Sequence, residues 1–538
     1  WARFDTPSGS VWRPIPRDRD QAFARFDGLA ARVVRHYWPQ LVEFESSYPS
    51  ISGLTFAGRA LDRRLLPVLE WHTWDSLVTA VQTRLTDQVL ARAVEAIPPG
   101  HRELGGAEIA AFLHTRRDGL REAAREFYRL LAHQADVHAT DHDEIATVTR
   151  LSEGDVRIEV RLAGAARPYL TRTYEKSDTH ELRIYMHGGD DTVVLDGEVR
   201  TPIVLRIIGG GGSDRFLDLA AASNVGVTRF YDRGDRTQFD VKGPIDRSTW
   251  RPTGGADVII PSSGSCNEGA IDTLPRDLVE PLRDWGNTIV GMPWLSYRTD
   301  VGLVVGGGFV YTRYGFRRSP YDYRLRVVGG VLTNDRDGFA ETELRVPAGA
   351  DGVAFNFLVR YSGVDFTRFH GLGNRTTSTR EPDFYRVQQQ LFEFLPSVRL
   401  RLDRSGAAQI SIGASVKHQN TRSDSTTILG ITQPYGLGGF GELGAVLSFD
   451  LDLRDHPVFP TRGLRLKGRA TFYPRFWDVA RRFGGFEGRA AMYLRARLPL
   501  QPVLALRAGG KWLWGRFPFH EAAYIGGSST LRGFRRKR

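Results

Sequence analysis

The sequence is poor in cysteine and has no long apolar run, and both absences limit the classes of protein it can belong to. Cys266 is the only cysteine among 538 residues, which excludes an internal disulfide and a metal cluster built on cysteine ligands. No run of about 18 or more apolar residues is present, which excludes a membrane-spanning helix. A strand of a membrane barrel needs only about 10 alternating residues, so the sequence still permits crossing a membrane with strands.

An excess of basic residues gives a formal net charge of +11, but the arginines are spread along the whole chain. Because no compact basic motif is present, we expect no nucleic-acid partner. The length predicts two to four domains. The sequence begins with Trp1, without a signal peptide, and stops shortly after Phe534, so we expect it to be part of a longer protein.

Residues 1–135 are expected to form a mostly α-helical module. Apolar residues recur at helical spacing from residue 29 onward. Thr73 and Thr86 each precede such a segment and are predicted to cap helices with their hydroxyl groups. The histidines of this region do not fall at i, i+4 pairs on one helix, so we expect none of them to be a metal ligand.

A pair of acidic residues, Asp18 and Asp20, precedes the helices and follows a predicted strand. Two carboxylates at this spacing can bind one divalent cation such as Mg²⁺ from a loop. The same residues can instead form a salt-bridged surface turn with Arg17 and Arg19. Both interpretations remain open.

Residues 145–245 are expected to form a small all-β domain, because strict alternation of apolar and polar residues replaces the helical pattern. Two glycine-rich turns carry the pattern Gly-x-Asp-x-apolar, with Asp191 in the first and Asp214 in the second. This pattern is the half-repeat of calcium-binding parallel β-rolls, so Ca²⁺ at these two residues is one hypothesis. We favour the alternative, a small β-solenoid or β-sandwich without calcium. Residues 246–283 are rich in Pro, Gly, Ser and Asp and are predicted to be a linker.

Residues 284–538 contain a series of long strands in which apolar and polar residues alternate. One face of each strand carries almost no charge, whereas the other is rich in arginine and lysine. Lipid outside and water inside explain this asymmetry, so the pattern predicts an antiparallel transmembrane β-barrel. Asp450 and Asp452 precede Arg465, Lys467 and Arg469 in one predicted hairpin, and we expect these charges to pair across the strands inside the barrel.

Three short motifs stand between or after these strands. The loop motif lies near the end of the sequence and consists of Gly526, Gly527, Leu531, Arg532, Gly533 and Phe534. The turn motif lies between two long strands and consists of Asp455, Pro457, Phe459, Pro460 and Gly463. The third motif is the run Phe-His-Gly-Leu-Gly-Asn at residues 369–374. Glycine permits positive φ and close backbone approach, so the loop motif is predicted to be a shaped loop rather than a strand or helix.

Over residues 286–538 the strands and the three motifs together resemble the Omp85 superfamily, which includes BamA, TamA and surface antigen D15-like barrels. The resemblance implies a transmembrane β-barrel in the bacterial outer membrane that assists the assembly or translocation of proteins or lipids. It implies no chemistry in the barrel and no cofactor. The implied partners are outer-membrane lipid and unfolded outer-membrane proteins or other exported substrates, and the N-terminal module would be periplasmic.

The resemblance also implies an orientation and a role for the motifs. The turn motif would be periplasmic, and the loop motif would be the tip of an extracellular loop that folds back into the barrel. Arg532 would be held there by a carboxylate on strands that follow the loop. Only ten or eleven strands precede the loop motif, so the barrel in this chain is expected to be partial and truncated before closure.

Residues 1–135 resemble the C-terminal lobe of CotH-like kinases, in which a strand ends in Pro-Trp-Asp-x-Asp; here Arg17 replaces the tryptophan. This resemblance implies an alternative function, a membrane-tethered, metal-dependent phosphotransferase whose nucleotide-binding lobe would precede Trp1. Asp18 and Asp20 would then hold Mg²⁺ against nucleotide phosphates. A third hypothesis is a soluble β-rich scaffold that binds calcium or carbohydrate. Whether the chain is an enzyme is left open.

Overall fold

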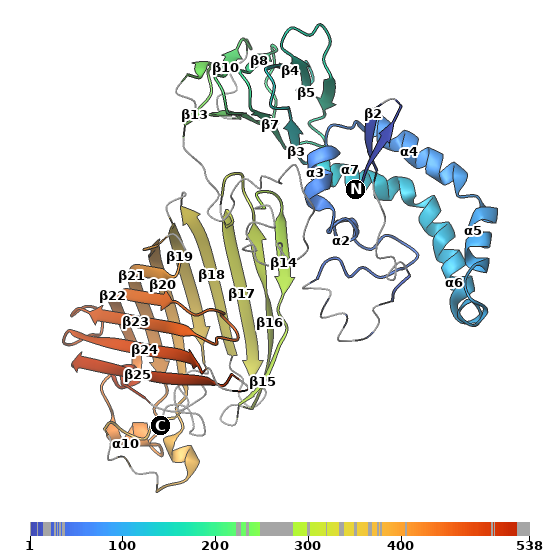
Figure 1. The fold of residues 1–538 in the computed structure, drawn as a ribbon. Helices are drawn as coiled ribbons and strands as arrows, with labels where there is room; N and C mark the ends of the chain where they lie inside the picture. The colour runs from blue at the N-terminus through green and yellow to red at the C-terminus, as the bar shows by residue number, and fades with distance from the viewer. Residues whose placement is uncertain are drawn as a thin grey trace. The chain divides into compact units, whose positions relative to one another are not determined.

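The computed structural model describes residues 2–7, 9–13, 23–25, 28, 31, 34, 38–221, 227–232, 236–247, 283–298, 302–318, 320–332, 338–348, 352–363, 368–373, 376, 379–403, 406–496, 499 and 501–524. The chain divides into two compact units, Trp1–Thr249 and Trp250–Arg538 (Figure 1). No helix within the described ranges is both long enough and apolar enough to cross a membrane.

The first part of the N-terminal unit is mostly helical. It opens with an antiparallel hairpin of β1 (Ala2–Thr6) and β2 (Gly9–Arg13). The described residues then form the helices α2 (Ile51–Leu54), α3 (Arg59–Leu65), α4 (Trp71–Arg84), α5 (Asp87–Glu95), α6 (Pro99–Asp118) and α7 (Leu120–Ala132). Helices α4 and α7 pack through aromatic side chains, because Trp74 and Phe127 meet edge to face with ring centroids 5.4 Å apart.

One of the two predicted helix caps is confirmed and the other is wrong. The Thr86 hydroxyl accepts a hydrogen bond from the Val89 amide at 3.3 Å and so caps α5. Helix α4 instead begins at Trp71 after an extended Glu70, which places Thr73 inside the first turn. The Thr73 amide already donates to the Glu70 carbonyl at 3.0 Å, so the helix starts before the predicted cap.

The second part of the N-terminal unit is a β-solenoid, one of the two folds that the sequence left open. Its two sheets have the strand orders β12-β10-β8-β4-β5-β6 and β13-β11-β9-β7-β3. The strands of the first sheet are β4 (Glu144–Arg150), β5 (Val156–Leu162), β6 (Leu170–Tyr174), β8 (Thr192–Asp196), β10 (Arg215–Asp218) and β12 (Gln238–Asp240). Those of the second are β3 (Gln134–His138), β7 (Glu181–His187), β9 (Val204–Gly210), β11 (Thr228–Tyr231) and β13 (Ile245–Asp246).

Stacked parallel strands define the solenoid coils. Thr192, Arg215 and Gln238 pair in register, so these coils repeat every 23 residues. The inward-facing side chains of both sheets form one dry core, including Ile158, Ile184 and Phe216. Helix α3 is tied to β3, because Arg63 forms an ion pair of 2.7 Å with Asp136.

The C-terminal unit is a single curled antiparallel sheet (Figure 1). Its strands are β14 (Asn287–Gly291), β15 (Trp294–Arg298), β16 (Gly302–Arg313), β17 (Tyr323–Leu332), β18 (Gly338–Ala348), β19 (Val353–Ser362), β20 (Gln389–Arg401), β21 (Ala408–Thr421), β22 (Gly438–Asp452), β23 (Gly463–Tyr473), β24 (Phe483–Arg495) and β25 (Val503–Gly515). β14 and β15 both pair with β16, and the rest follow in chain order. This confirms the predicted partial antiparallel barrel wall.

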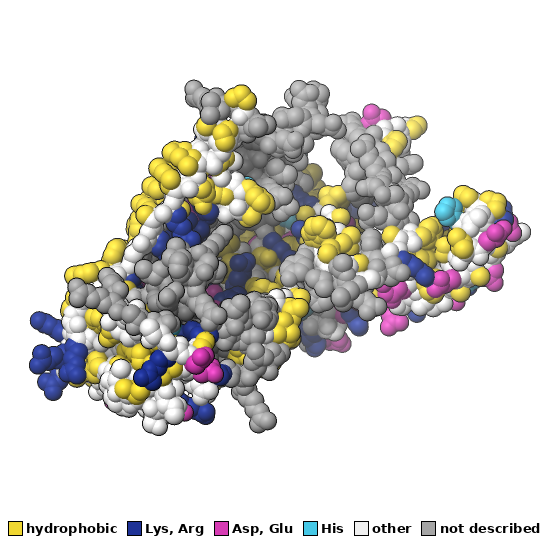
Figure 2. Space-filling view, turned by 90° about the horizontal axis from the view of Figure 1, so that it is seen from below, with side chains coloured by type: hydrophobic (Ala, Val, Ile, Leu, Met, Phe, Trp, Pro, Cys, Tyr) yellow, Lys and Arg dark blue, Asp and Glu magenta, His cyan; other side chains and the backbone are white. Residues whose placement is uncertain are grey.

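The two faces of the sheet differ as the alternation predicts. Apolar side chains on the convex face are exposed, among them Phe357 on β19 and Leu447 on β22. The intervening side chains face the concave side, where Lys417 and Glu442 are buried. In Figure 2, hydrophobic side chains follow the outside of the sheet, while lysine and arginine side chains lie in its hollow. An apolar outside and a polar inside are typical of a transmembrane barrel.

The predicted pairing of charges on the concave face is confirmed for Arg465 and Lys467, whereas Arg469 stands opposite Ser448. The Lys467 ammonium lies 3.2 Å from the Asp450 carboxylate across the β22–β23 pair. Arg465 lies 3.4 Å from Asp450 and 3.5 Å from Asp452.

The strand connections differ between the two ends of the sheet. At one end, which we call the turn end, lie the connections 314–322, 349–352, 402–407, 453–462 and 496–502. At the other, the loop end, lie the described parts of 363–388, 422–437 and 474–482, together with the segment after β25. Short helices occur only in the loop-end connections of the described sheet: η1 (Pro382–Tyr385), α10 (Ile428–Thr432) and η2 (Phe519–Glu521).

Candidate functional site

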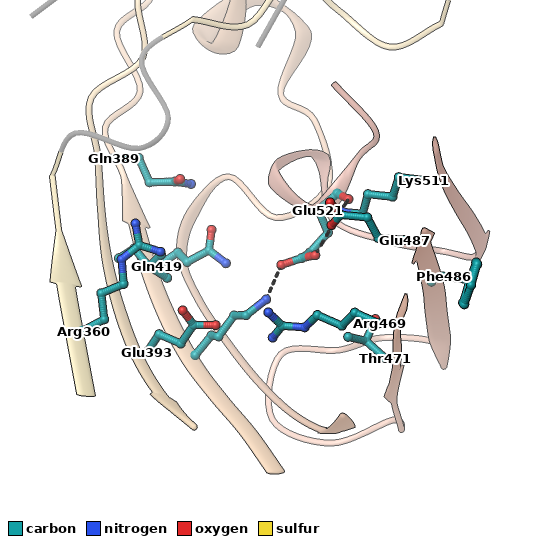
Figure 3. Close-up of a pocket in the computed structure, with 13 residues that line it drawn as sticks. Arg360, Gln389, Glu393, Gln419, Arg469, Thr471, Phe486, Glu487, Lys511 and Glu521 are labelled. Carbon is teal, nitrogen blue, oxygen red and sulfur yellow. Dashed lines mark hydrogen bonds and ion pairs between the residues drawn. The ribbon is translucent and has the colours of Figure 1, made fainter. Parts of the chain in front are cut away.

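A polar cavity of about 350 Å³ lies on the concave side of the sheet, toward the loop end (Figure 3). Apart from the outward-facing Phe486, its lining residues come from inward-facing strand positions and from η2. They are Arg360, Gln389, Leu391, Glu393, Lys417, Gln419, Arg469, Thr471, Gly485, Phe486, Glu487, Lys511 and Glu521. Alternation along each strand explains the polar lining, because every second residue faces the water-filled side.

The segment 516–524, which we call the stem, leaves β25 and enters this cavity. The Glu521 carboxylate on η2 lies 2.5 Å from the Lys417 ammonium of β21, as the dashed line in Figure 3 marks. Lys511 of β25 lies 3.5 Å from the same carboxylate and donates a hydrogen bond of 2.6 Å to the Glu521 carbonyl. The stem is therefore fastened to two strands that are far apart in the sheet.

A second carboxylate also approaches Lys417. Glu442 of β22 is fully buried, and one of its oxygens lies 3.4 Å from the Lys417 ammonium. A buried charge is costly unless it is paired, so one ammonium between two carboxylates ties β21, β22 and the stem together. Glu393 also lines the cavity and is buried.

An apolar cluster holds the other side of the stem. Phe519 is buried and meets the ring of Phe369 edge to face, with ring centroids 5.2 Å apart. Val387 and Leu429 are buried in the same cluster. Phe369 opens the predicted third motif, so the structure brings that motif against the segment that precedes the loop motif.

The stem also bonds to itself. The Tyr524 hydroxyl donates a hydrogen bond of 2.5 Å to the Phe519 carbonyl. The last described residue, Tyr524, thus lies beside η2. The loop motif itself (Gly526, Gly527, Leu531, Arg532, Gly533 and Phe534) lies outside the described residues.

The turn motif is a closely hydrogen-bonded connection between β22 and β23. The Asp455 carboxylate accepts hydrogen bonds from the Thr461 amide at 2.8 Å, the Thr461 hydroxyl at 2.5 Å and the Arg462 amide at 3.1 Å. The Thr461 hydroxyl and the two amides lower the pKa of Asp455 well below its usual range. Gly463 has a φ of 113°, which only glycine adopts readily, and begins β23.

Other members of the turn motif face solvent or shape the backbone. Phe459 is 78% exposed. The Phe459 amide donates a hydrogen bond of 2.9 Å to Nδ1 of His456. Pro457 contributes a carbonyl that accepts from Arg454 at 3.1 Å, and Pro460 precedes the turn back toward Gly463.

The two aspartates of the solenoid stack on adjacent coils at one corner. The Asp214 carboxylate accepts a hydrogen bond from the Asp191 amide at 3.1 Å, and the Asp191 carboxylate accepts one from the Glu144 amide at 2.9 Å. Each of the two residues is 1% exposed, and burial raises both pKa values to about 7. The described residues include no group of three His, Cys, Asp or Glu side chains placed to hold a metal, and calcium at Asp191 and Asp214 stays a prediction.

Asp18 and Asp20 lie outside the described residues, and Mg²⁺ at that position likewise stays a prediction.

Sequence reasoning missed part of the site that the structure assembles. Lys417 and Glu442 stood on the polar faces of their predicted strands, so the alternation of apolar and polar residues could have identified them as facing the lumen. Glu521 carries no local signal, because it follows the last strand in a segment without periodicity.

The fold and the site together define the C-terminal unit as the wall of a transmembrane barrel with a loop stem docked inside it. Residues 343–538 match the family model described as the Omp85 superfamily domain, so this part of the chain is an Omp85-type outer-membrane β-barrel domain.

Among solved structures, the chain is similar to "The crystal structure of BamA from Haemophilus ducreyi lacking POTRA domains 1-3", with 15% sequence identity and a TM-score of 0.34. The similarity covers 47% of this chain and 46% of that one, so this chain spans about half of that protein's length. No curated protein matches the chain.

Proposed function

We propose that this protein is an outer-membrane protein whose Omp85-type barrel assists the insertion or translocation of proteins or lipids, and whose N-terminal module is periplasmic. The observation that carries the proposal is the stem, which is docked inside a polar lumen by Glu521 and Phe519 immediately before the loop motif. A loop held inside the barrel, rather than projecting from it, is suited to controlling access to the lumen or the opening of the wall.

The orientation follows from the connections. Transmembrane barrels carry short periplasmic turns and longer extracellular loops. The turn end, with the Asp455 motif, therefore faces the periplasm, and the loop end, with the connections 363–388 and 422–437, faces outward. The partners that this arrangement suits are outer-membrane lipid and unfolded outer-membrane proteins or other exported substrates. The barrel itself needs no cofactor.

A vesicle assay tests the proposal. The full chain is reconstituted, and the insertion of an unfolded outer-membrane barrel protein is followed by the shift of its folded band on a gel. The substitution Glu521→Gln removes the ion pairs that anchor the stem and leaves Lys417 and Glu442 in place, so we expect at least about tenfold slower insertion.

The matched control is Glu487→Gln, which removes a carboxylate from the same cavity but not from the stem. Its ion pair with Arg489 is partly exposed, and exposed pairs contribute little, so insertion should stay close to wild type. Equal insertion rates for Glu521→Gln and the wild type would contradict the proposed role of the stem. A wild-type chain that does not promote insertion of any client would contradict the function itself.

The alternative phosphotransferase function gains no support from the described residues, since Asp18 and Asp20 are not among them.

A further inference from the structure

Three arginines surround an open hollow of about 710 Å³ at the loop end, beside the β23–β24 connection. Arg475, Arg481 and Arg482 line it together with Phe472, Pro474 and Ala480. All three arginines are exposed. Within the described part of the chain, none of their side chains makes a hydrogen bond or an ion pair. Three uncompensated guanidinium groups in one place favour an anionic ligand.

The connection that carries the arginines is held firmly to the barrel. The Asp478 carboxylate accepts a hydrogen bond of 2.7 Å from the Gly441 amide of β22. The Ala480 amide donates a hydrogen bond of 2.8 Å to the Tyr435 hydroxyl. Val479 is buried against Phe440 and Phe483. The one acidic residue of the connection is thus occupied by the backbone and does not neutralise the arginines.

The hollow opens on the outer face of the sheet. Phe472 is at an outward-facing position near the end of β23 and is 42% exposed. Its ring stacks on Trp514 of β25, with centroids 5.9 Å apart. Phe486 and Trp512 are exposed on the same face and are opposite each other in the β24–β25 pair. These four residues form an aromatic group at the loop end of the convex face.

Aromatic side chains on the outside of a barrel gather at the level of the lipid headgroups. The arginines lie immediately beyond the aromatic group, where the phosphates of lipids would stand. We propose that Arg475, Arg481 and Arg482 form a binding site for the phosphorylated headgroup of an anionic lipid, with Phe472 and Trp514 contacting its acyl chains. The inference rests on the proposed membrane location and adds a lipid specificity to it.

The site is tested with the full chain in vesicles of phosphatidylcholine that contain phosphatidic acid, whose headgroup is a phosphate monoester. Bound lipid is measured by native mass spectrometry after gentle release from the vesicles. The wild type should bind phosphatidic acid at least about tenfold more tightly than phosphatidylcholine of the same chain length. Each basic residue near a membrane surface contributes about a factor of five, so the triple substitution Arg475→Gln/Arg481→Gln/Arg482→Gln should weaken binding about 100-fold.

A matched control removes the same charge from other connections of the loop end, as Arg380→Gln/Arg386→Gln/Arg422→Gln. These residues do not line the hollow, so we expect their substitution to leave lipid binding unchanged. An equal loss of phosphatidic acid binding in both triple variants, or no loss in the first, would overturn the proposed lipid site.

Two further arms separate the possible failures. Inorganic phosphate that displaces the lipid at equal concentration would show a site for free phosphate, and an acidic peptide that displaces it would show a protein site; either overturns the lipid assignment. Flotation with the vesicles first checks insertion. A chain that does not insert contradicts the proposed function, whereas an inserted chain without preference for phosphatidic acid overturns only the lipid site.

Discussion

Lys417 is the residue that joins the stem to the β21–β22 strand pair. Its ammonium lies between Glu442, which belongs to the neighbouring strand, and Glu521, which belongs to the stem. The lysine also lies above the ring of Tyr473, 5.4 Å from its centroid. A single side chain therefore connects two strands, the stem and the aromatic lining of the lumen.

We predict that Lys417→Met destabilises the folded barrel by about 3–5 kcal/mol, because it leaves the buried Glu442 carboxylate without its cation and leaves Glu521 with Lys511 alone. The double variant Lys417→Met/Glu442→Gln should be less damaging, since it removes the unpaired charge as well. The measurement is denaturant unfolding of the reconstituted protein, followed by the mobility of the folded band. A double variant as unstable as the single one would contradict this account.

At the scale of single elements, the β22–β23 connection shows how one glycine sets a turn. Gly463 has positive φ, and a Cβ at this position would collide with the Leu453 carbonyl oxygen. Gly468, in the same strand, faces outward and has room for a Cβ, whose nearest neighbour would be Phe486 at 3.6 Å.

Gly463→Ala is therefore expected to destabilise the β22–β23 hairpin by more than about 1 kcal/mol, whereas Gly468→Ala should be close to neutral. Folding of the two variants into lipid vesicles, compared at the same denaturant concentration, checks the difference. Equal behaviour of both glycines would show that the turn does not limit the stability of the hairpin.

The two buried aspartates at the solenoid corner lead to a separate prediction about how the stability of the solenoid depends on pH. The pKa values of Asp191 and Asp214 are raised by burial to about 7, above the value near 4 of an unfolded aspartate. The folded domain thus holds more protons than the unfolded chain. The contribution of this corner to stability is complete below about pH 4 and is lost as the pH rises through 7.

Hydrogen exchange of residues 181–218 in the whole chain, in metal-free buffer, measures this effect. The equilibrium constant for opening of the domain should rise by up to about tenfold per pH unit for each of the two carboxyl groups between pH 4 and 7. Asp191→Asn/Asp214→Asn should flatten that dependence. A pH dependence equal to that of the wild type would rule the two aspartates out as its source.

The sequence predicted the elements that depend on local pattern and missed those that depend on contact. Alternation identified the barrel strands and the inward positions of Asp450 and Lys467, because side chains alternate between the faces of any strand. It did not separate solenoid from sandwich, since the pairing of residues 192 and 215 joins strands that are not consecutive in the chain. Glu521 was missed for the same reason, because its partner Lys417 lies in a distant strand.

For the whole molecule, the structure divides the C-terminal unit into a lipid side and a water side. Leu447 lies near the middle of β22, points outward and is 45% exposed, whereas the next residue, Ser448, points inward. The same strand therefore offers two neighbouring positions in opposite environments.

Leu447→Arg is expected to destabilise the membrane-inserted barrel by about 2–4 kcal/mol, because an arginine near the middle of a bilayer is costly. Ser448→Arg should have a much smaller effect, because its side chain reaches the polar lumen. Reversible folding into vesicles measures both. If Ser448→Arg were the more damaging substitution, the assignment of the two faces would be reversed.

The spacing of the solenoid coils limits how this protein can change in length. Successive coils are joined at one acidic corner, where the Glu144 amide donates a hydrogen bond to Asp191 and the Asp191 amide donates one to Asp214. A deletion or insertion of one residue within residues 192–238 would move the side chains that follow it in the strand to the wrong face, whereas a change of 23 residues would remove or add one complete coil. Related proteins should accordingly differ in the length of this domain by whole coils and not by single residues.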